Sequence, residues 1–250
     1  MKAAAIIPAR YGSTRFPGKP LAEIAGKTMI ERVYRQTQKA VKPDRVLVAT
    51  DDTRIASTVR DFAGEAVMTA GDHTSGTDRI AEVAADLEEE IIVNVQGDEP
   101  LIKPEMVDKA INLLQEDKKI KMSTLAAPMS QEDIQDENIV KVVRDLNNQA
   151  LYFSRAPIPG GIKNNKQTEA SNSPQILRHI GLYGFRRDFL LTFTDFAPTP
   201  LEKRESLEQL RALEHGFNIK LGITAHHGPG VDRPEDIKTV EKILSGRDNL

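Results

Sequence analysis

The sequence contains no cysteine among its 250 residues. Disulfide bonds, thiolate zinc sites and cysteine nucleophiles are therefore excluded. The sequence also lacks an uninterrupted apolar run of the roughly 18 residues that a membrane-spanning helix needs. Its apolar N-terminal stretch meets Pro8 at once, so it is too short for a signal peptide. We therefore expect a cytoplasmic protein with no membrane partner.

The chain also has little net charge. Its 34 Lys and Arg residues against 37 Asp and Glu residues give −3 at pH 7. That balance gives no electrostatic reason to expect nucleic acid as a partner, so any anion must be held by a local cluster of bases. Hydrophobic residues make up 39% and charged residues 28%, which is ordinary for a globular protein with a real core.

Over the first half of the chain, apolar runs of strand length alternate with helical patterns. The predicted strands are Lys2–Ile7, Arg45–Thr50, Ala66–Thr69, Ile91–Val95 and Lys121–Ala127. The predicted helices are Met29–Ala40, Arg54–Phe62, Arg79–Leu87 and Pro104–Leu114. Strands joined through helices predict crossover connections, hence an α/β fold with a mostly parallel central sheet flanked by helices.

After residue 138 the pattern becomes less regular, which predicts a smaller mixed-sheet part. The predicted strands are Ile139–Arg144, Ala150–Ser154, Ile180–Arg186 and Asn218–Thr224, and the predicted helices are Glu205–Glu214 and Pro234–Leu244. Between them, Pro157–Pro174 is rich in proline, glycine and asparagine and is interpreted as a long loop. The sequence favours neither a lid nor a surface loop for this segment.

The first predicted strand runs into PARYGSTRFPGKP, from Pro8 to Pro20. Arg10, Arg15 and Lys19 share this loop with glycines and hydroxyl side chains, including Ser13. Glycines let the backbone approach an anion whose oxygens the bases and hydroxyls can bind. Because the loop follows a strand, where open α/β sheets bind ligands, it favours a triphosphate site over a solvated turn. Its glycine spacing is not that of a Walker loop.

Carboxylates follow in two further segments. Asp98 ends the apolar strand of VNVQGDEP and is placed to hold Mg²⁺ against phosphate oxygens, although Asp is also common as a cap. Asp232, in GVDRPED, has the same two interpretations, with the cap belonging to the last helix. Ser75, Gly76 and Arg79, in TSGTDR, could contact a base or a phosphate, or form an ordinary helix cap.

The second half offers polar groups suited to a polyhydroxylated ligand. In a strand, His179 and Tyr183 lie on one face. Glu205, Glu208 and Gln209 stand at i, i+3 and i+4 of a predicted helix, hence on one face. The default interpretation is a solvated face, but carboxylates and amides also bind hydroxyl groups well.

Eight segments occur in one order over nearly the whole chain: IIPARYGSTRFPGKPL, VLVATDD, HTSGTDRIAEV, NVQGDEPLI, LYFSRAPIP, RHIGLYGF, LEQLRALEHG and GVDRPED. The ordered set resembles the 3-deoxy-manno-octulosonate (KDO) cytidylyltransferases, the CMP-KDO synthetases of bacterial lipopolysaccharide synthesis. The resemblance implies a nucleotide-diphospho-sugar-transferase-like fold, a homodimer, CTP as donor and Mg²⁺ as cofactor. It implies one nucleotidyltransferase domain, with residues 1–137 mainly binding nucleotide and 138–250 forming the sugar-acid pocket and a dimer contact. The reaction implied is CMP transfer to the C2 hydroxyl of KDO, with release of pyrophosphate.

By motif match, the resemblance also assigns residues. The implied catalytic residues are Arg10, Arg15, Lys19, Asp98 and Asp232, and the last two would bind Mg²⁺. The implied nucleotide-binding residues are Ala9, Arg10, Ser13, Arg15, Lys19, Ser75, Gly76, Arg79 and Gln96. The implied sugar-acid-binding residues are Arg155, His179, Tyr183, Glu205, Glu208 and Gln209. One departure is Arg233, where the family usually has threonine.

Three alternatives remain open at this point. The nearest is a cytidylyltransferase for another 2-keto sugar acid, such as 8-amino-KDO or a sialic-acid-like sugar. A sugar-1-phosphate nucleotidyltransferase usually carries a denser glycine-rich signature than this chain has. A nucleotide-binding regulator that has lost catalysis is disfavoured by the presence of Lys19, Asp98 and Asp232.

Overall fold

The computed structural model describes residues 1–12, 15–130, 132–160, 176–226 and 228–246. Its strands are β1 (Ala3–Ala9), β2 (Glu23–Ile24), β3 (Lys27–Thr28), β4 (Arg45–Thr50), β5 (Ala66–Met68), β6 (Ile91–Asn94), β7 (Met122–Pro128), β8 (Lys141–Arg144), β9 (Ala150–Ser154), β10 (Leu177–Arg186) and β11 (Ile219–Ile223). Its α-helices are α1 (Met29–Thr37), α2 (Thr53–Asp61), α3 (Gly76–Ala85), α4 (Pro104–Glu116), α5 (Arg187–Asp195), α6 (Pro200–Glu205), α7 (Gln209–Glu214) and α8 (Asp236–Leu244), and η1 (Lys19–Leu21) and η2 (Glu132–Gln135) are 3₁₀ turns.

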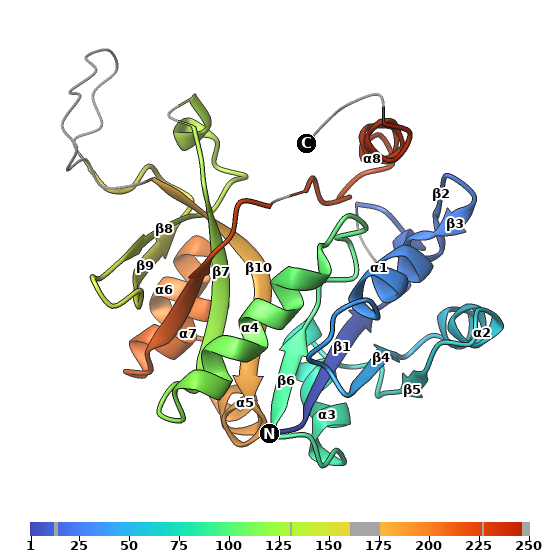
Figure 1. Cartoon of the computed structure of the whole chain (residues 1–250), viewed down its shortest axis with the longest axis horizontal. Coiled ribbons are helices and arrows are strands. Elements are labelled where there is room, and N and C mark those ends of the chain that lie inside the picture. The colour runs from blue at the N-terminus through green and yellow to red at the C-terminus, as the bar shows by residue number, and fades with distance from the viewer. Residues whose placement is uncertain (13–14, 131, 161–175, 227, 247–250) are drawn as a thin grey trace.

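The main sheet has the strand order β11-β7-β10-β6-β1-β4-β5 (Figure 1). β1 pairs in parallel with β4 and β6, β4 with β5, and β7 with β11. Only β10 on this path runs antiparallel to its neighbours β6 and β7, and the β8–β9 hairpin extends from it. The prediction of a mostly parallel central sheet flanked by helices is confirmed.

Strand β1 shows why the sheet is covered on both faces. Its side chains alternate between the two faces, so Ile6 packs into one apolar cluster and Ile7 into the other. Helices α3, α5 and α7 bury one face, and α1, α2 and α4 bury the other. Figure 1 shows α4 in front of the sheet and α5 behind it. A strand buried on both faces needs a nearly continuous apolar run, which is what the sequence has there.

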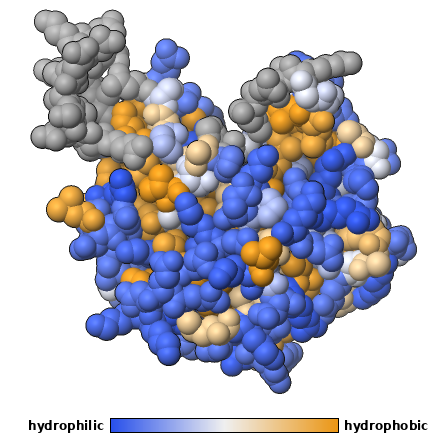
Figure 2. Space-filling model, in the orientation of Figure 1, coloured by the Kyte–Doolittle hydropathy of each residue, from blue (hydrophilic) through white to orange (hydrophobic). Residues whose placement is uncertain are grey.

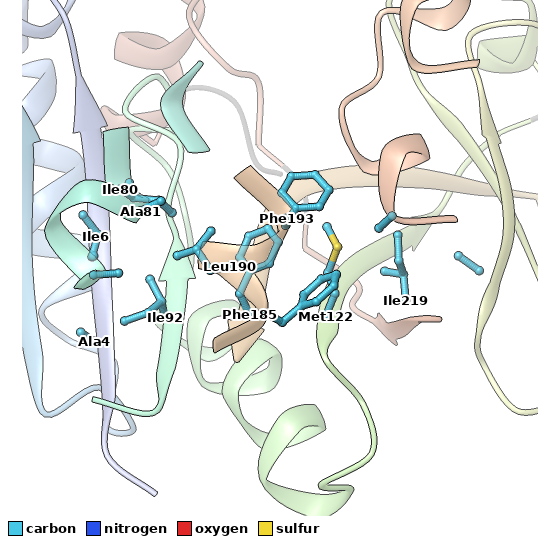
Figure 3. Packing of buried hydrophobic residues seen from close by; sticks show 14 of the residues in the cluster. Ala4, Ile6, Ile80, Ala81, Ile92, Met122, Phe185, Leu190, Phe193 and Ile219 are labelled. Carbon is cyan, nitrogen blue, oxygen red and sulfur yellow. The ribbon is translucent and has the colours of Figure 1, made fainter. Parts of the chain in front are cut away.

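The cluster on the α3–α5 face is the larger of the two. Figure 3 shows strand residues Ile6, Ile92, Met122 and Phe185 packed with the helix residues Ile80, Leu190 and Phe193. Hydrophilic residues cover most of the face seen in Figure 2. No helix in the described part of the chain combines the length and apolar character that crossing a membrane requires.

The second half differs from the prediction in two places. The single helix predicted over Glu205–Glu214 is wrong, because the chain forms α6 and α7 with a break at Ser206, whose φ is +55°. Helix α5, the second difference, was not predicted. In the first half, the short β2–β3 hairpin was not predicted either. Most of the predicted Pro157–Pro174 loop lies outside the described residues.

Candidate active site

The loop after β1 turns back on itself before it reaches η1. The Gly18 amide donates to the Tyr11 carbonyl oxygen at 2.9 Å. Gly18 has φ of +72°, and a Cβ there would lie 3.1 Å from the Tyr11 ring. Only glycine meets both conditions without strain. The turn directs Lys19, the first residue of η1, toward the carboxyl ends of β1 and β6. Ser13, in the same loop, lies outside the described residues.

Two bases and two carboxylates from distant parts of the sequence meet beside this turn. Lys19 Nζ lies 2.7 Å from Asp98 Oδ2 and 3.5 Å from Asp232 Oδ1. Arg15 Nη1 lies 3.2 Å from Asp232 Oδ2. The Val231 amide donates to the Asp98 carbonyl oxygen at 2.9 Å, and its own carbonyl accepts from Lys19 at 3.0 Å. These contacts bring two of the predicted triphosphate bases, Arg15 and Lys19, together with the two predicted metal ligands.

Neither carboxylate caps a helix, so that alternative is wrong for both. Asp98 accepts a hydrogen bond from Lys19, and the N-cap position of the following helix, α4, is occupied by Lys103. At α8, the amides of Asp232 and Arg233 donate to Asp236 Oδ2, which leaves the Asp232 carboxylate for the two bases. Arg233, the departure from the family, has its guanidinium 3.8 Å from Glu235.

At the start of α3, the helix-cap interpretation of the TSGTDR motif is confirmed. Ser75 forms a capping box with Asp78, which satisfies the first amides of the helix. Arg79 is buried, and its guanidinium donates to Thr69 Oγ1 at 2.5 Å and to the Ala70 carbonyl at 3.2 Å. Asp51 Oδ1 lies 3.3 Å from the same guanidinium.

A cavity of about 220 Å³ opens between β1, β6 and the start of α3, and we call it the first cavity. The predicted nucleotide-binding and catalytic residues that line it are Ala9, Arg10, Lys19, Ser75, Gly76, Arg79, Gln96 and Asp98. A Cβ at Gly97 would lie 2.8 Å from the Pro8 carbonyl oxygen. The loop after β6 can therefore approach the end of β1 this closely only because residue 97 is glycine. The structure thus assembles a base-rich cavity at the switch point of the sheet.

A second cavity, of about 270 Å³, adjoins the first through Gly76 and Gln96. Tyr183, Glu208 and Gln209 line it. The Tyr183 hydroxyl donates to Gln209 Oε1 at 3.0 Å, and within the described residues Gln209 Nε2 is buried without a partner. Burial raises the pKa values of the Glu208 carboxyl and of the Tyr183 phenol. The arrangement offers an unsatisfied amide donor and a phenol to a polar ligand.

His179 lies next to this cavity, and the prediction that it shares a face with Tyr183 is confirmed by a ring-centroid distance of 5.4 Å. Its Nε2 lies 2.9 Å from Thr124 Oγ1. Burial lowers the pKa of the imidazole to about 3, so the ring is neutral at physiological pH.

Arg155 and Glu205 are bound to each other rather than to the other predicted sugar-acid residues. Glu205 accepts from Ser154 Oγ at 2.8 Å and from the Arg155 amide at 3.0 Å. Arg155 Nε donates to the Glu205 carbonyl oxygen at 3.1 Å. Because of the Ser206 break, Glu205 does not share a helical face with Glu208 and Gln209, contrary to the prediction. Neither residue is among those lining the first and second cavities.

Two carboxyl groups near the cluster were given no role from the sequence. Glu99 follows Asp98, and burial, with the neighbouring Asp98 charge, raises its pKa to about 8. Asp51 holds Arg79. Both follow strands at the carboxyl edge of the sheet, where open α/β folds bind ligands, and this position could have indicated them as site residues.

The carboxylates of Asp98 and Asp232 fit a magnesium ion. They converge on one cation, the Lys19 ammonium, so their oxygens are already turned toward a shared positive charge. Among the residues that the structure describes, no three or more His, Asp and Glu side chains gather as a metal site. Mg²⁺ commonly takes only one or two protein carboxylates and completes its shell with water and substrate phosphate.

This fold and site define the chain as a nucleotidyltransferase, and a family model described as cytidylyltransferase matches residues 4–221. The chain is 53% identical to the 3-deoxy-manno-octulosonate cytidylyltransferase of Syntrophotalea carbinolica, covering 98% of this chain and 100% of that one. It is 53% identical to the enzyme of the same name from Geobacter metallireducens, with 97% and 98% covered. A solved structure of CMP:2-keto-3-deoxy-manno-octonic acid synthetase complexed with CTP superposes with a TM-score of 0.92, at 40% identity, covering 99% of this chain and 100% of that one. The chain belongs to the 3-deoxy-manno-octulosonate cytidylyltransferase family.

Proposed function

We propose that the chain transfers CMP from CTP to the C2 hydroxyl of KDO, releasing pyrophosphate, and so supplies the activated sugar for lipopolysaccharide biosynthesis. The observation that carries the proposal is the meeting of Arg15, Lys19, Asp98 and Asp232 beside the first cavity, which the second cavity adjoins. The relative solved with CTP, at 40% identity, supports the choice of nucleotide.

In this reaction the C2 oxygen of the sugar acid forms a bond to the α-phosphorus of CTP. The bond from that phosphorus to the oxygen bridging it to the β-phosphorus breaks, and pyrophosphate leaves. Arg10, Arg15 and Lys19 supply the positive charge that the triphosphate and the departing pyrophosphate need. The chain thus contributes mainly positioning and charge neutralisation.

The sugar acid is assigned to the second cavity. Its hydroxyl groups would accept from Gln209 Nε2 and contact the Tyr183 phenol, so the buried amide would gain the partner it lacks within the described residues. Glu208 lines the same cavity, and its raised pKa reflects the loss of water around the carboxyl group. His179, held against Thr124, lies beside Tyr183, and its ring is neutral at physiological pH.

Magnesium is the proposed cofactor, held by Asp98 and Asp232. When bound, Mg²⁺ supplies charge neutralisation and polarisation at phosphate oxygens. The proposal also includes a cytoplasmic homodimer. Leu146 and Leu151, both highly exposed on the β8–β9 hairpin, support a subunit contact there.

The test is pyrophosphate release with CTP, Mg²⁺ and KDO, beside wells with UTP, ATP, 8-amino-KDO or a sialic acid. We expect release that requires both CTP and KDO. Asp98→Asn should abolish turnover while the far-UV circular dichroism stays unchanged, because an amide cannot replace the carboxylate charge. Wild-type activity of that variant would refute the role of Asp98, and silence with every acid would refute the proposed reaction. Sedimentation of the same preparation reports whether two chains associate.

A further inference from the structure

The oxygens proposed to hold magnesium already carry cationic donors. Asp98 Oδ2 lies 2.7 Å from Lys19 Nζ, and Asp232 Oδ1 lies 3.5 Å from the same nitrogen. Asp232 Oδ2 lies 3.2 Å from Arg15 Nη1. The Lys19 ammonium therefore occupies the space toward which both carboxylates point, and a divalent cation there must displace it.

Lys19 is the stronger of the two competitors. Its side chain is 16% exposed and that of Asp98 is 33% exposed, whereas Arg15 and Asp232 are 67% and 62% exposed. Water screens the exposed pair, so that pair contributes little. The partly buried pair interacts in a lower dielectric, and Lys19 also donates to the Val231 carbonyl at 3.0 Å.

We propose that Lys19 keeps divalent cations off the Asp98–Asp232 pair until a nucleoside triphosphate draws the ammonium away, so that nucleotide binding creates the metal site. This inference rests on the proposed function, because it takes the triphosphate to be the anion that Lys19 meets. Lys19 and Asp98 both line the first cavity, so the ammonium can pass from carboxylate to phosphate by rotation of its flexible side chain.

Two consequences follow from this competition. Without nucleotide, the chain should bind divalent cations weakly despite the two carboxylates. With nucleotide, metal and triphosphate should strengthen each other's binding, because a coupling between two ligands is reciprocal. Loss of the Lys19 charge should break the coupling, raising the metal affinity of the nucleotide-free chain and weakening its affinity for triphosphate.

The experiment is a nucleotide-free titration with Mn²⁺, in which electron paramagnetic resonance measures the free ion. It compares the wild type with Lys19→Met, with the double variant Lys19→Met/Asp98→Asn, and with Lys27→Met. Lys27 is the matched control, because its ammonium pairs with Glu31 at 3.1 Å and not with Asp98 or Asp232. We expect Lys19→Met to bind Mn²⁺ at least about tenfold more tightly, or about 1.4 kcal/mol. The double variant should lose this gain, and Lys27→Met should match the wild type.

The inference is overturned if Lys19→Met binds Mn²⁺ no more tightly than the wild type, or if the gain survives Asp98→Asn. A gain in Lys27→Met would also overturn it, by showing an effect of net charge alone. If Lys19→Met does not fold, Lys19→Gln takes its place, because its amide can still donate to the Val231 carbonyl. Pyrophosphate release by the wild type is scored separately, so failure of the metal competition is distinguishable from failure of the proposed reaction.

Discussion

Arg79 reaches the first cavity from the start of α3, yet the groups that hold it lie on other segments. Thr69 and the Ala70 carbonyl accept from its guanidinium just after β5, and Asp51 balances its charge just after β4. A buried guanidinium keeps one orientation only while such partners surround it. Asp51 is therefore expected to position Arg79 toward the nucleotide.

The residue-scale prediction is that Asp51→Asn weakens CTP binding. The amide keeps the size of the side chain but removes the charge that faces Arg79. We expect the KM for CTP to rise up to about tenfold, equivalent to about 1.4 kcal/mol, with kcat and the KM for the sugar acid within about twofold of wild type. Steady-state kinetics with each substrate varied in turn measure this split.

The neighbouring Asp52→Asn is the matched control. Asp52 caps α2, accepting from the Arg54 amide at 2.9 Å, and asparagine caps helices equally well. Its kinetic constants should equal those of the wild type. Equal changes in both variants would show that the loop, rather than the Asp51 charge, controls the KM for CTP.

The sequence predicts the bases and carboxylates of the site better than their supporting residues. Lys19, Asp98 and Asp232 stand out because each follows a strand or precedes a helix in a short polar motif. Nothing local separates Asp51 from Asp52, although one faces Arg79 and the other caps α2. That difference depends on where α3 packs, and hence on the tertiary structure.

At the scale of elements, the central strands β1 and β6 of the first half are predicted well because they are buried on both faces. β6, Ile91–Asn94, is fully buried, and its continuous apolar run in the sequence predicts a central strand. The break between α6 and α7 gives no such signal. Ser206 adopts the left-handed conformation in which helices usually end at a glycine. Because the residue is serine, the sequence does not indicate that the helix ends there.

The element-scale prediction concerns this break. Ser206→Val should lower the free energy of unfolding by about 1–3 kcal/mol, because a β-branched residue tolerates positive φ poorly. It should also raise the KM for the sugar acid more than that for CTP, because Ser206 lines the second cavity with Glu208 and Gln209. Urea unfolding and steady-state kinetics measure the two effects.

Ser206→Gly serves as the control for the backbone. Glycine adopts positive φ freely, so this variant should keep both the wild-type stability, within about 1 kcal/mol, and the KM for the sugar acid. If Ser206→Val unfolds at the same urea concentration as Ser206→Gly, the left-handed turn does not constrain this position.

At the scale of the whole molecule, the C-terminal segment returns to the first loop. Val231 and Val240 pack with Ile24, Met29 and Leu101 in a small apolar cluster. Helix α8 lies beside the β2–β3 hairpin, and the Ala25 amide donates to Glu241 at 2.8 Å (Figure 1). Packing between the two ends of the chain thus sets where Asp232 meets Lys19, which no local pattern predicts.

His179 links the site to the stability of the whole fold through pH. Burial lowers its pKa to about 3 in the folded chain, whereas the unfolded chain approaches the ordinary value of 6.5. Between these two values the unfolded state binds more protons. The free energy of unfolding should therefore fall as pH drops below about 6.5, by at most about 1.4 kcal/mol per pH unit. Above about pH 7 this contribution is constant.

The measurement is urea unfolding of the wild type and of His179→Gln between pH 5 and pH 7, followed by far-UV circular dichroism because the chain has no tryptophan. His179→Gln cannot be protonated, so its stability should depend less steeply on pH than that of the wild type, whatever its stability at pH 7. The exposed His215, stacked on Phe196, provides the control: His215→Gln should keep the wild-type slope. Parallel curves for the wild type and His179→Gln would mean that protonation of the His179 imidazole is not what destabilises the fold in mild acid.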